Sequence, residues 1–394
     1  MNALKRIASS PLVSAAFLMA TSAIGPGFLT QTAVFTDRLG ASFAFVILVS
    51  IILDIGVQLN IWRILAVSGI RAQDIANQVV PGAGYLLSGL IAIGGLAFNV
   101  GNLAGTGLGL QVLTGMDTRY GAIASALVAM GIFGMRQGLV WMDGIARVLG
   151  VLMLVLTGYV VLHAHPPLRL AVQKAVLPDR VDGTAIITLV GGTVGGYICF
   201  AGGHRLLDSG VKGVSALPEV DRSAVTGITL AALMRVLLFL AALGVVSQGF
   251  ILQKGNPAAS VFQLAAGENG YMLFGMVMWC AAITSVTGSA YTSVSFLKTF
   301  HPALEKRSTW LTMIFIAFSA LVYIAIGNPV KVLVAVGAIN GFVLPLALGL
   351  MLLGAYRSRV MKGYRHPLWL TAFGIAVIIA LLWISMLAIR KGIW

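Results

Sequence analysis

The sequence has little charge for its length. Only 10% of its 394 residues are Asp, Glu, Lys or Arg, whereas 59% are hydrophobic. Soluble domains carry roughly 25% charged residues, so the low charge excludes a soluble domain of this size. We expect the lipid bilayer to be the solvent of this chain.

Residue patterns that mark enzymes and metal centres are also missing. We find no Ser/His/Asp constellation, no His-Glu-x-x-His and no phosphate-binding Gly-Lys-Ser/Thr loop. The two cysteines, Cys199 and Cys280, lie inside apolar runs without metal-ligand spacing, which favours buried and inert thiols. The sequence therefore predicts neither an enzyme nor a bound cofactor or resident metal.

Long apolar runs fill most of the chain. They are about 20 residues long and do not alternate as strands do, and lipid leaves backbone groups unsatisfied unless they bond within a helix or a closed barrel. The sequence thus predicts an all-α membrane protein that forms one transmembrane domain over residues 1–394. The eleven expected helices are 11–38, 41–67, 83–113, 118–135, 141–163, 184–212, 222–250, 259–298, 309–327, 330–355 and 366–389.

The net charge of +14 could indicate a nucleic-acid partner, but the basic residues stand singly between apolar runs. That distribution is typical of the loops that orient a membrane protein, so we expect a lipid partner and no nucleic acid. Most Lys and Arg residues fall in the segments that share a side with Lys5 and Arg6. The positive-inside rule then predicts a cytoplasmic N-terminus and an outside C-terminus. We expect the membrane to be a bacterial inner membrane.

Two of the expected helices are interrupted at corresponding places. The first contains Gly25-Pro26-Gly27, and the sixth contains glycine pairs between Gly191 and Gly203. Two halves that each begin with a broken span indicate an inverted-repeat transporter with its substrate site between the breaks. The repeats would cover about 11–163 and 184–355, with 366–389 as an added helix. The alternative is that these glycines only allow close helix packing.

Several motifs resemble the NRAMP family of proton-coupled divalent-metal transporters. The run from Gly25 to Phe45 is similar to that family's first-helix motif, and Gln111 to Gly115, Ser285 to Ser289 and Leu344-Pro345 are similar to later motifs. The resemblance covers nearly the whole chain. It implies about eleven helices in the 5+5 inverted repeat shared with sodium-coupled amino-acid symporters, and alternating access around a site in mid-membrane.

The family's functional positions carry different residues here. By the resemblance, Gly25 and Phe28 stand where the family has its metal-binding Asp and Asn, and Ile198-Cys199-Phe200 stands near its Met-Pro-His. Asn99 and Asn102 stand where the family has the acidic pair that carries protons, and Gly337 stands at a Gln. Neither break keeps a carboxylate, although carboxylates are the groups that compensate a divalent cation.

Without acids, the free backbone N–H groups after each break favour an anion. The leading prediction is therefore a secondary transporter of a small organic acid, and the resemblance implies 5-oxoproline or a relative. The alternatives are a divalent-metal transporter with an unusual ligand set and a channel without coupling. The residues expected to line the substrate site are Gly25, Pro26, Gly27, Phe28, Thr30, Gln31, Asn99, Asn102, Tyr197, Phe200, Ala201 and His204.

Each of these polar residues also has a structural interpretation. Thr30 and Gln31 could bond helix backbone, and Asn99 and Asn102, three residues apart, could join neighbouring helices. His204 could be an ordinary buried histidine, or the titratable group nearest the site.

Asp54 is the only acid, and Arg235 the only base, that falls deep inside an expected span. Intramembrane charges are costly, so each needs a partner or a water-filled cavity. One interpretation is a structural ion pair between Asp54 and Arg235. The other is that Asp54 carries the coupling proton.

Overall fold

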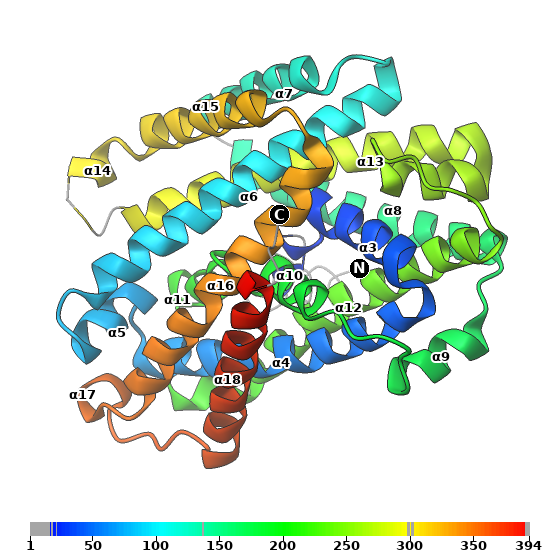
Figure 1. Cartoon of the computed structure of the whole chain (residues 1–394). Coiled ribbons are helices and arrows are strands. Elements are labelled where there is room, and N and C mark those ends of the chain that lie inside the picture. Colours follow the sequence, from blue (N-terminus) through cyan, green and yellow to red (C-terminus); the bar gives the residue numbers. More distant parts are fainter. Residues whose placement is uncertain are drawn as a thin grey trace, which may run out of the picture.

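The computed structural model describes residues 16, 19, 20, 22–135, 138–297, 300 and 303–390. These residues form helices, and no strand occurs among them (Figure 1). The start of the first expected helix, together with Lys5 and Arg6, lies outside the described residues, as do Arg136 and Lys298.

The fold prediction is confirmed: each of the eleven expected segments contains helix. Eight stretches of the described chain are long and apolar enough to span a membrane, and a ninth is the pair Gly150–Ala164 and Leu168–Val176, which bends by 108°. In that count the first two expected helices form one stretch, and one expected helix is shorter at 17 residues. The helices are α3 (Pro26–Leu39), α4 (Phe43–Ser68), α6 (Ala83–Thr114), α7 (Thr118–Gly134), α8 (Gly138–Ala164), α10 (Gly183–Thr193), α11 (Ile198–Asp208), α12 (Leu217–Ser247), α13 (Pro257–Leu297), α15 (Ser308–Ile326), α16 (Pro329–Ala355) and α18 (Leu368–Arg390).

The structure corrects the expected segments in two ways. The helix expected over 259–298 is not continuous, because Gly267 has φ 65° and ψ −165°, a conformation that only glycine adopts readily. Several connections that the sequence predicts to be polar loops also contain short helices. These are α5 (Ala72–Val79), α9 (Leu168–Val176), α14 (Ala303–Lys306) and α17 (Ser358–Met361).

Helix α9 is held against the start of α4 by polar contacts. The backbone N–H of Asp179 donates to the Ser42 hydroxyl over 3.1 Å, and Lys174 binds the Asp179 carboxylate. The Lys174 hydrogen bond holds the pKa of Asp179 below its ordinary value. Arg38 pairs with Asp182 over 3.1 Å at the same end of the molecule. The long connection between the two halves is therefore folded onto the bundle.

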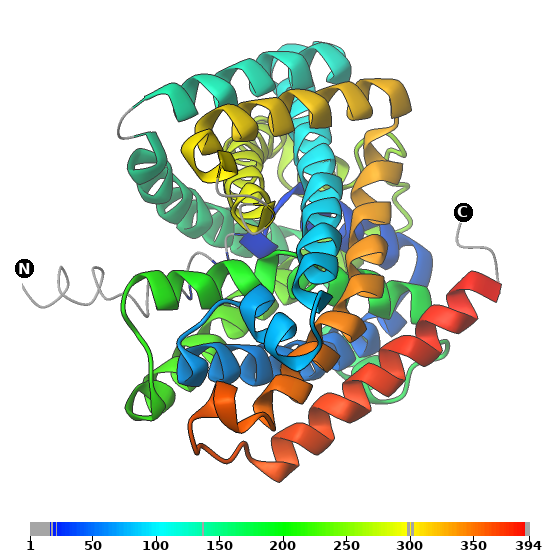
Figure 2. The same cartoon turned by 90° about the vertical axis from the view of Figure 1, so that its left-hand side faces the viewer.

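Small residues let the central helices approach closely. Helices α6 and α16 run side by side (Figure 2), and α13 packs along α6 as well. A Cβ on Gly109 of α6 would lie 2.7 Å from the backbone N of Trp279 in α13. In lipid, such backbone contact supplies van der Waals packing that the hydrophobic effect cannot.

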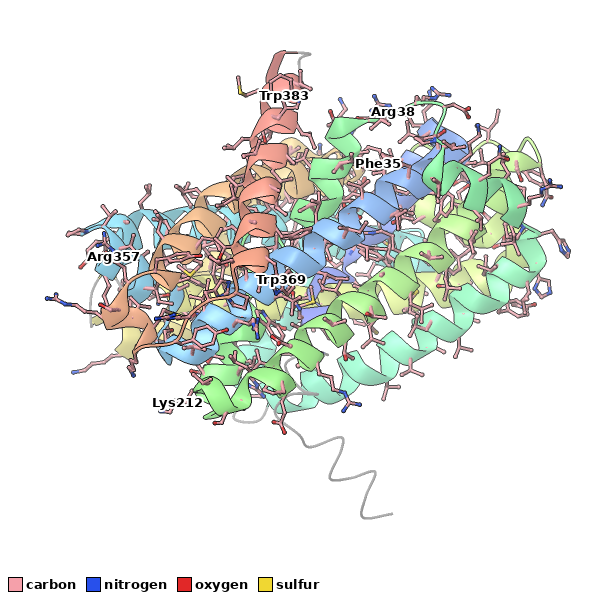
Figure 3. All side chains as sticks on the ribbon, turned by 90° about the horizontal axis from the view of Figure 1, so that it is seen from below. Phe35, Arg38, Lys212, Arg357, Trp369 and Trp383 are labelled. Atoms are coloured by element: carbon pink, nitrogen blue, oxygen red, sulfur yellow. The ribbon has the colours of Figure 1, made fainter. Side chains whose placement is uncertain are left out.

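Helix α18 lies on the outside of the bundle against α4, α10 and α16. Trp369 and Trp383 lie near its two ends and are 65% and 63% exposed (Figure 3). Exposed Trp at the two ends of a span is typical of the two membrane interfaces. The expected added helix is thus a lipid-facing element and lies away from the helix breaks.

Candidate functional site

The first break lies at Gly25. This residue precedes α3 with an extended backbone, φ −103° and ψ −177°, and no side chain caps the helix start. Pro26 follows as the first helical residue, where its missing N–H costs nothing. Pro26 packs on Gly105 of α6, because a Cβ there would lie 2.1 Å from the Pro26 Cβ. The start of α3, beside Asn102 of α6 and Ser285 of α13, is therefore uncapped, and its first backbone N–H groups have no partner within the helix.

The second break separates α10 from α11 over residues 194–197. Gly196 has φ +55°, and a Cβ on it would lie 1.8 Å from Oδ1 of Asn340. Asn340 itself is fully buried in α16 and donates to the carbonyl oxygens of Gly94 and Val336 over 3.1 and 3.0 Å. Sequence reasoning did not find Asn340, since an isolated Asn in an apolar run carries no local signal of such a contact.

Arg235 of α12 reaches both breaks. Its side chain is 2% exposed, and its Nη1 donates to the Thr193 hydroxyl, at the end of α10, over 2.8 Å. Its guanidinium carbon lies 4.0 Å from the centre of the Phe28 ring, three residues after the first break. Its Nε and Nη2 atoms have no hydrogen-bond partner among the described residues. A buried cation with free donors therefore lies where α3 and α10 meet.

Asp54 of α4 is the matching buried acid, with 1% exposure. It lies close enough to Arg235 and Thr193 to interact with both electrostatically, and its Oδ1 has no hydrogen-bond partner. The ion pairs found among the described residues do not include Asp54 with Arg235. The two charges therefore face each other beside Thr193 rather than in direct contact.

Other expected site residues surround the first break. Gln31 donates to the carbonyl oxygen of Leu333 in α16 over 2.8 Å, while its Oε1 stays without a partner. The Thr30 hydroxyl is buried and also lacks a partner. A Cβ on Gly25 would lie 3.4 Å from the Asn102 Oδ1 and 3.5 Å from the Ser285 hydroxyl. These groups form a hydrogen-bonding lining without formal charge.

Asn99 and Tyr197 lie where α6 and α13 meet the second break. The Asn99 amide donates to the Val286 carbonyl oxygen over 2.7 Å and to the Ser289 hydroxyl over 2.9 Å. The Tyr197 ring stacks edge-on against Phe98 at 5.3 Å, and its hydroxyl faces Ser289 without a hydrogen bond of ordinary geometry. Asn99 therefore joins two helices with its donor side, while its Oδ1 and the Tyr197 hydroxyl are unpartnered.

His204, Phe200 and Ala201 are buried along α11. The backbone N–H of Ala72, at the start of α5, donates to Nε2 of His204 over 3.3 Å, and the ring stacks near Phe296 at 5.0 Å. This contact makes Nε2 an acceptor and places the ring proton on Nδ1. His204 thus caps α5, about two turns beyond the break.

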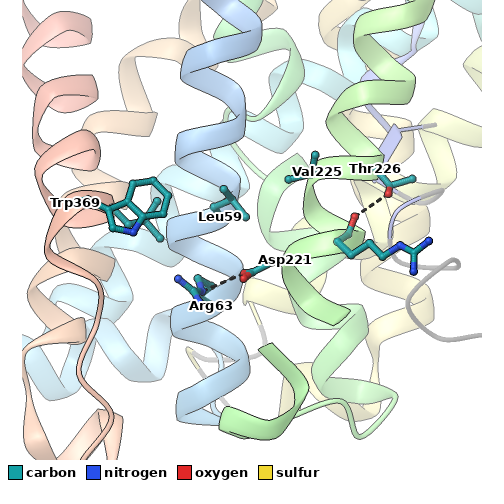
Figure 4. A pocket seen from close by; sticks show the side chains of 8 residues that line it. Leu59, Arg63, Asp221, Val225, Thr226 and Trp369 are labelled. Carbon is teal, nitrogen blue, oxygen red and sulfur yellow. Dashed lines mark hydrogen bonds and ion pairs between the residues drawn. The ribbon is translucent and has the colours of Figure 1, made fainter. Parts of the chain in front are cut away.

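A separate open groove of about 380 Å³ lies between α4, α12 and α18 (Figure 4). Arg63 and Asp221 form an ion pair of 3.1 Å in it, next to Trp369. Arg63 follows Asp54 by nine residues, about 14 Å along the helix. Arg63 therefore belongs to this peripheral groove and takes no part in the Asp54 network.

Among the residues that the structure describes, no three His, Cys, Asp or Glu side chains gather closely enough to hold a metal ion. A metal at the breaks would need the oxygens of Thr, Asn, Gln and backbone carbonyls as its main donors. Hard divalent cations do accept such oxygens, but usually together with carboxylates.

The family follows from the sequence match over residues 16–390 to the natural resistance-associated macrophage protein-like proteins. This chain belongs to that family, whose architecture is a 5+5 inverted repeat with broken first and sixth helices. Two relatives match this chain over most of its length and over most of their own. The uncharacterized membrane protein YcsG of Bacillus subtilis is 56% identical over 94% of this chain and 92% of its own length. An uncharacterized membrane protein of Haemophilus influenzae is 54% identical over 93% of each.

Solved structures agree with this fold. The manganese transporter of Eremococcus coleocola matches with a TM-score of 0.76 over 96% of this chain and 86% of its own, at 14% identity. The transporter MhsT in complex with L-phenylalanine matches with a TM-score of 0.63 over 96% and 98%, at 16% identity. Similarity at this identity establishes the fold alone. By family and fold, the chain is an integral membrane transporter.

Proposed function

We propose that this protein is a secondary active transporter that moves a small organic acid by alternating access between the two helix breaks. The solute crosses the membrane without chemical change. The family membership supports transport, and discontinuous helices meeting in mid-membrane are typical of substrate sites in this architecture.

The observation that carries the substrate class is Arg235. Its unpartnered Nε and Nη2 atoms are two donors in the arrangement that a carboxylate binds, and its guanidinium carbon lies 4.0 Å from the centre of the Phe28 ring in the first turn of α3. A cation in this place attracts an anion and repels Mn²⁺ or Mg²⁺ at close range. A small carboxylate that also carries an amide, such as 5-oxoproline, would use the neutral groups of Thr30, Gln31 and Asn102 for its remaining hydrogen bonds.

The second candidate is a divalent metal. Membership of this family and the similarity to the manganese transporter of Eremococcus coleocola support a metal substrate more directly than they support a carboxylate. In this candidate the ion is held by backbone and side-chain oxygens near Gly25 and Asn102. Arg235 must then be balanced by Asp54 throughout the cycle.

Binding in detergent separates the two candidates. A ligand that binds only the folded state raises the melting temperature. We expect 5-oxoproline, lactate or succinate to raise it, and Mn²⁺, Mg²⁺ and Ca²⁺ to leave it unchanged. The same panel is then tested for counterflow in liposomes, because saturable exchange identifies a carrier and ohmic current a channel. Manganese counterflow without any carboxylate binding would replace the first candidate with the second.

The proposed setting is a bacterial inner membrane, with the N-terminus in the cytoplasm and the C-terminus outside. The basic residues Lys212, Arg357 and Arg222 then face the cytoplasm, as the positive-inside rule requires. Figure 3 shows Lys212 on the side opposite Arg38. A reporter fused to residue 394 tests this orientation: an alkaline phosphatase fusion should be active and a green fluorescent protein fusion dark.

A further inference from the structure

Asp54 and Arg235, the two charged groups beside the helix breaks, can balance each other's charge before any solute binds. Asp54 and Arg235 are 1% and 2% exposed and lie beside one hydroxyl, that of Thr193. Thr193 accepts from Arg235 and donates its own proton to the Leu189 carbonyl oxygen over 2.8 Å. With both groups ionised the pair is neutral in total, and each group keeps an unpartnered atom.

A carboxylate bound to Arg235 changes this balance. With Asp54 ionised, two anions would share one cation in a buried site, where an unpaired charge is strongly unfavourable. Like charges brought this close favour protonation of one of them. The solute's carboxylate would gain the two free guanidinium donors, whereas Asp54 has only the Thr193 hydroxyl beside it and an Oδ1 without a partner. Asp54 is thus the group that should take the proton.

We infer that Asp54 and the solute's carboxylate compete for the charge of Arg235, so that each carboxylate enters together with one proton. This inference rests on the proposed function. In the step, Asp54 carboxylate takes one proton from the side to which the site is open, and Arg235 remains a guanidinium and binds the anion. After the site opens to the other side, the anion leaves and Asp54 releases the proton. A monocarboxylate therefore crosses without net charge.

The surroundings of Asp54 leave no other described group to carry this proton. The charged or titratable side chains that act on it are Arg235 from α12 and the Cys199 thiol from α11. Helix α10 contributes only the Thr193 hydroxyl. Helices α3, α9, α16, α17 and α18 also pack against α4, and none of their described charged side chains acts on Asp54. His204 is held at the start of α5 through its Nε2.

Calorimetry on the whole purified protein tests the inference. Binding of 5-oxoproline or lactate is measured in two buffers with different ionisation enthalpies, and their difference gives the protons taken up. We expect one proton for each carboxylate bound. The affinity should weaken by about tenfold for each pH unit over the range in which Asp54 is ionised.

The variant Asp54→Asn should bind the same carboxylate without proton uptake and with an affinity independent of pH. Asp221→Asn, the same change in the peripheral groove, should keep the uptake of one proton. If Asp54→Asn does not fold, wild-type protein in liposomes gives the answer, since lactate flux should not respond to an imposed membrane potential.

Different results would overturn the inference and the proposed function. Carboxylate binding without proton uptake, or proton uptake that persists in Asp54→Asn, would overturn the inference and leave the proposed function in place. A lactate flux driven by membrane potential would do the same. No carboxylate binding by the wild type would overturn the proposed function itself.

Discussion

The guanidinium of Arg235 lies 4.0 Å from the centre of the Phe28 ring, although the two residues are 207 positions apart in the chain. A cation over an aromatic face gains roughly 0.5–2 kcal/mol, more when it is desolvated. Phe28 therefore holds Arg235 toward the breaks while its Nε and Nη2 donors stay available.

Replacing Arg235 with Gln should abolish most carboxylate binding. A hydrogen bond to a charged group contributes about 1.5–3 kcal/mol, so the Kd should rise roughly 10- to 100-fold. Isothermal calorimetry with 5-oxoproline or lactate measures the change. Arg222→Gln is the matched control, since Arg222 belongs to the same helix but is exposed in the peripheral groove, and its Kd should equal that of the wild type. Equal weakening in both variants would contradict a local role for Arg235.

The second break should depend on Gly196. Gly196→Ala places a Cβ in a left-handed conformation and 1.8 Å from the Asn340 oxygen, so Asn340 must move and lose its bonds to α6 and α16. We expect a loss of stability of at least about 1–3 kcal/mol, seen as a lower melting temperature in detergent.

The variant Gly210→Ala separates the two causes of that loss of stability, which are backbone strain at a positive φ and the clash with Asn340. Gly210 has φ +78°, and a Cβ on it would meet no atom within 4 Å. Its substitution therefore carries only the backbone strain, about 1 kcal/mol. Equal destabilisation by both alanines would show that the contact with Asn340 contributes nothing.

His366 should make the protein less stable in acid. Its Nε2 lies 2.9 Å from the Asn60 Oδ1, to which it donates, and its Nδ1 is buried without a partner. Burial, together with the nearby Arg63, lowers the pKa of His366 from 6.5 to about 4. Above pH 6.5 the ring is neutral in both states and its stabilisation is complete. As the pH falls from about 6.5 to about 4, the unfolded chain takes up a proton that the folded chain resists, so stability is lost.

The melting temperature between pH 8 and pH 4 measures this effect. In His366→Gln the acid-dependent loss should be smaller, because Gln can still donate to Asn60 but does not titrate. An unchanged pH profile in this variant would mean that other groups cause the loss.

The ion pair of Arg63 with Asp221 should matter little for stability. Both side chains are partly exposed, and such pairs contribute about 0–1 kcal/mol. Asp221→Asn should therefore shift the melting temperature by only a few degrees, with the shift shrinking in high salt. A large loss of stability would show that the groove joins α4 to α12 more tightly than the exposure of the pair indicates.

Much of the candidate site followed from local chemistry. The break at Gly25-Pro26-Gly27 was predicted correctly, because proline lacks an N–H and glycine tolerates the conformations that end a helix. The second break was predicted only within a run of glycines. The structure places it over residues 194–197, where Gly196 alone in that run has a positive φ.

The tertiary contacts could not be predicted in the same way. Asn340 and Thr193 have no local pattern that separates them from other polar residues in apolar helices, yet one contacts the break and the other binds Arg235. His204 was expected beside the break because it follows it closely in sequence. The structure instead ties its ring to the start of α5, 132 positions away.

The sequence by itself determined the solvent of this protein, its eleven helical segments and the approximate places of the breaks in the first and sixth expected helices, but not the interruption at Gly267. These properties follow from the length of apolar runs and from glycine and proline chemistry, both of which act within about 20 residues of chain. Only the tertiary structure decided that Arg235 meets both breaks and that Asp54 faces it beside Thr193. Those contacts depend on which faces of distant helices pack together, and packing in lipid is set by the shapes of whole surfaces rather than by any short pattern.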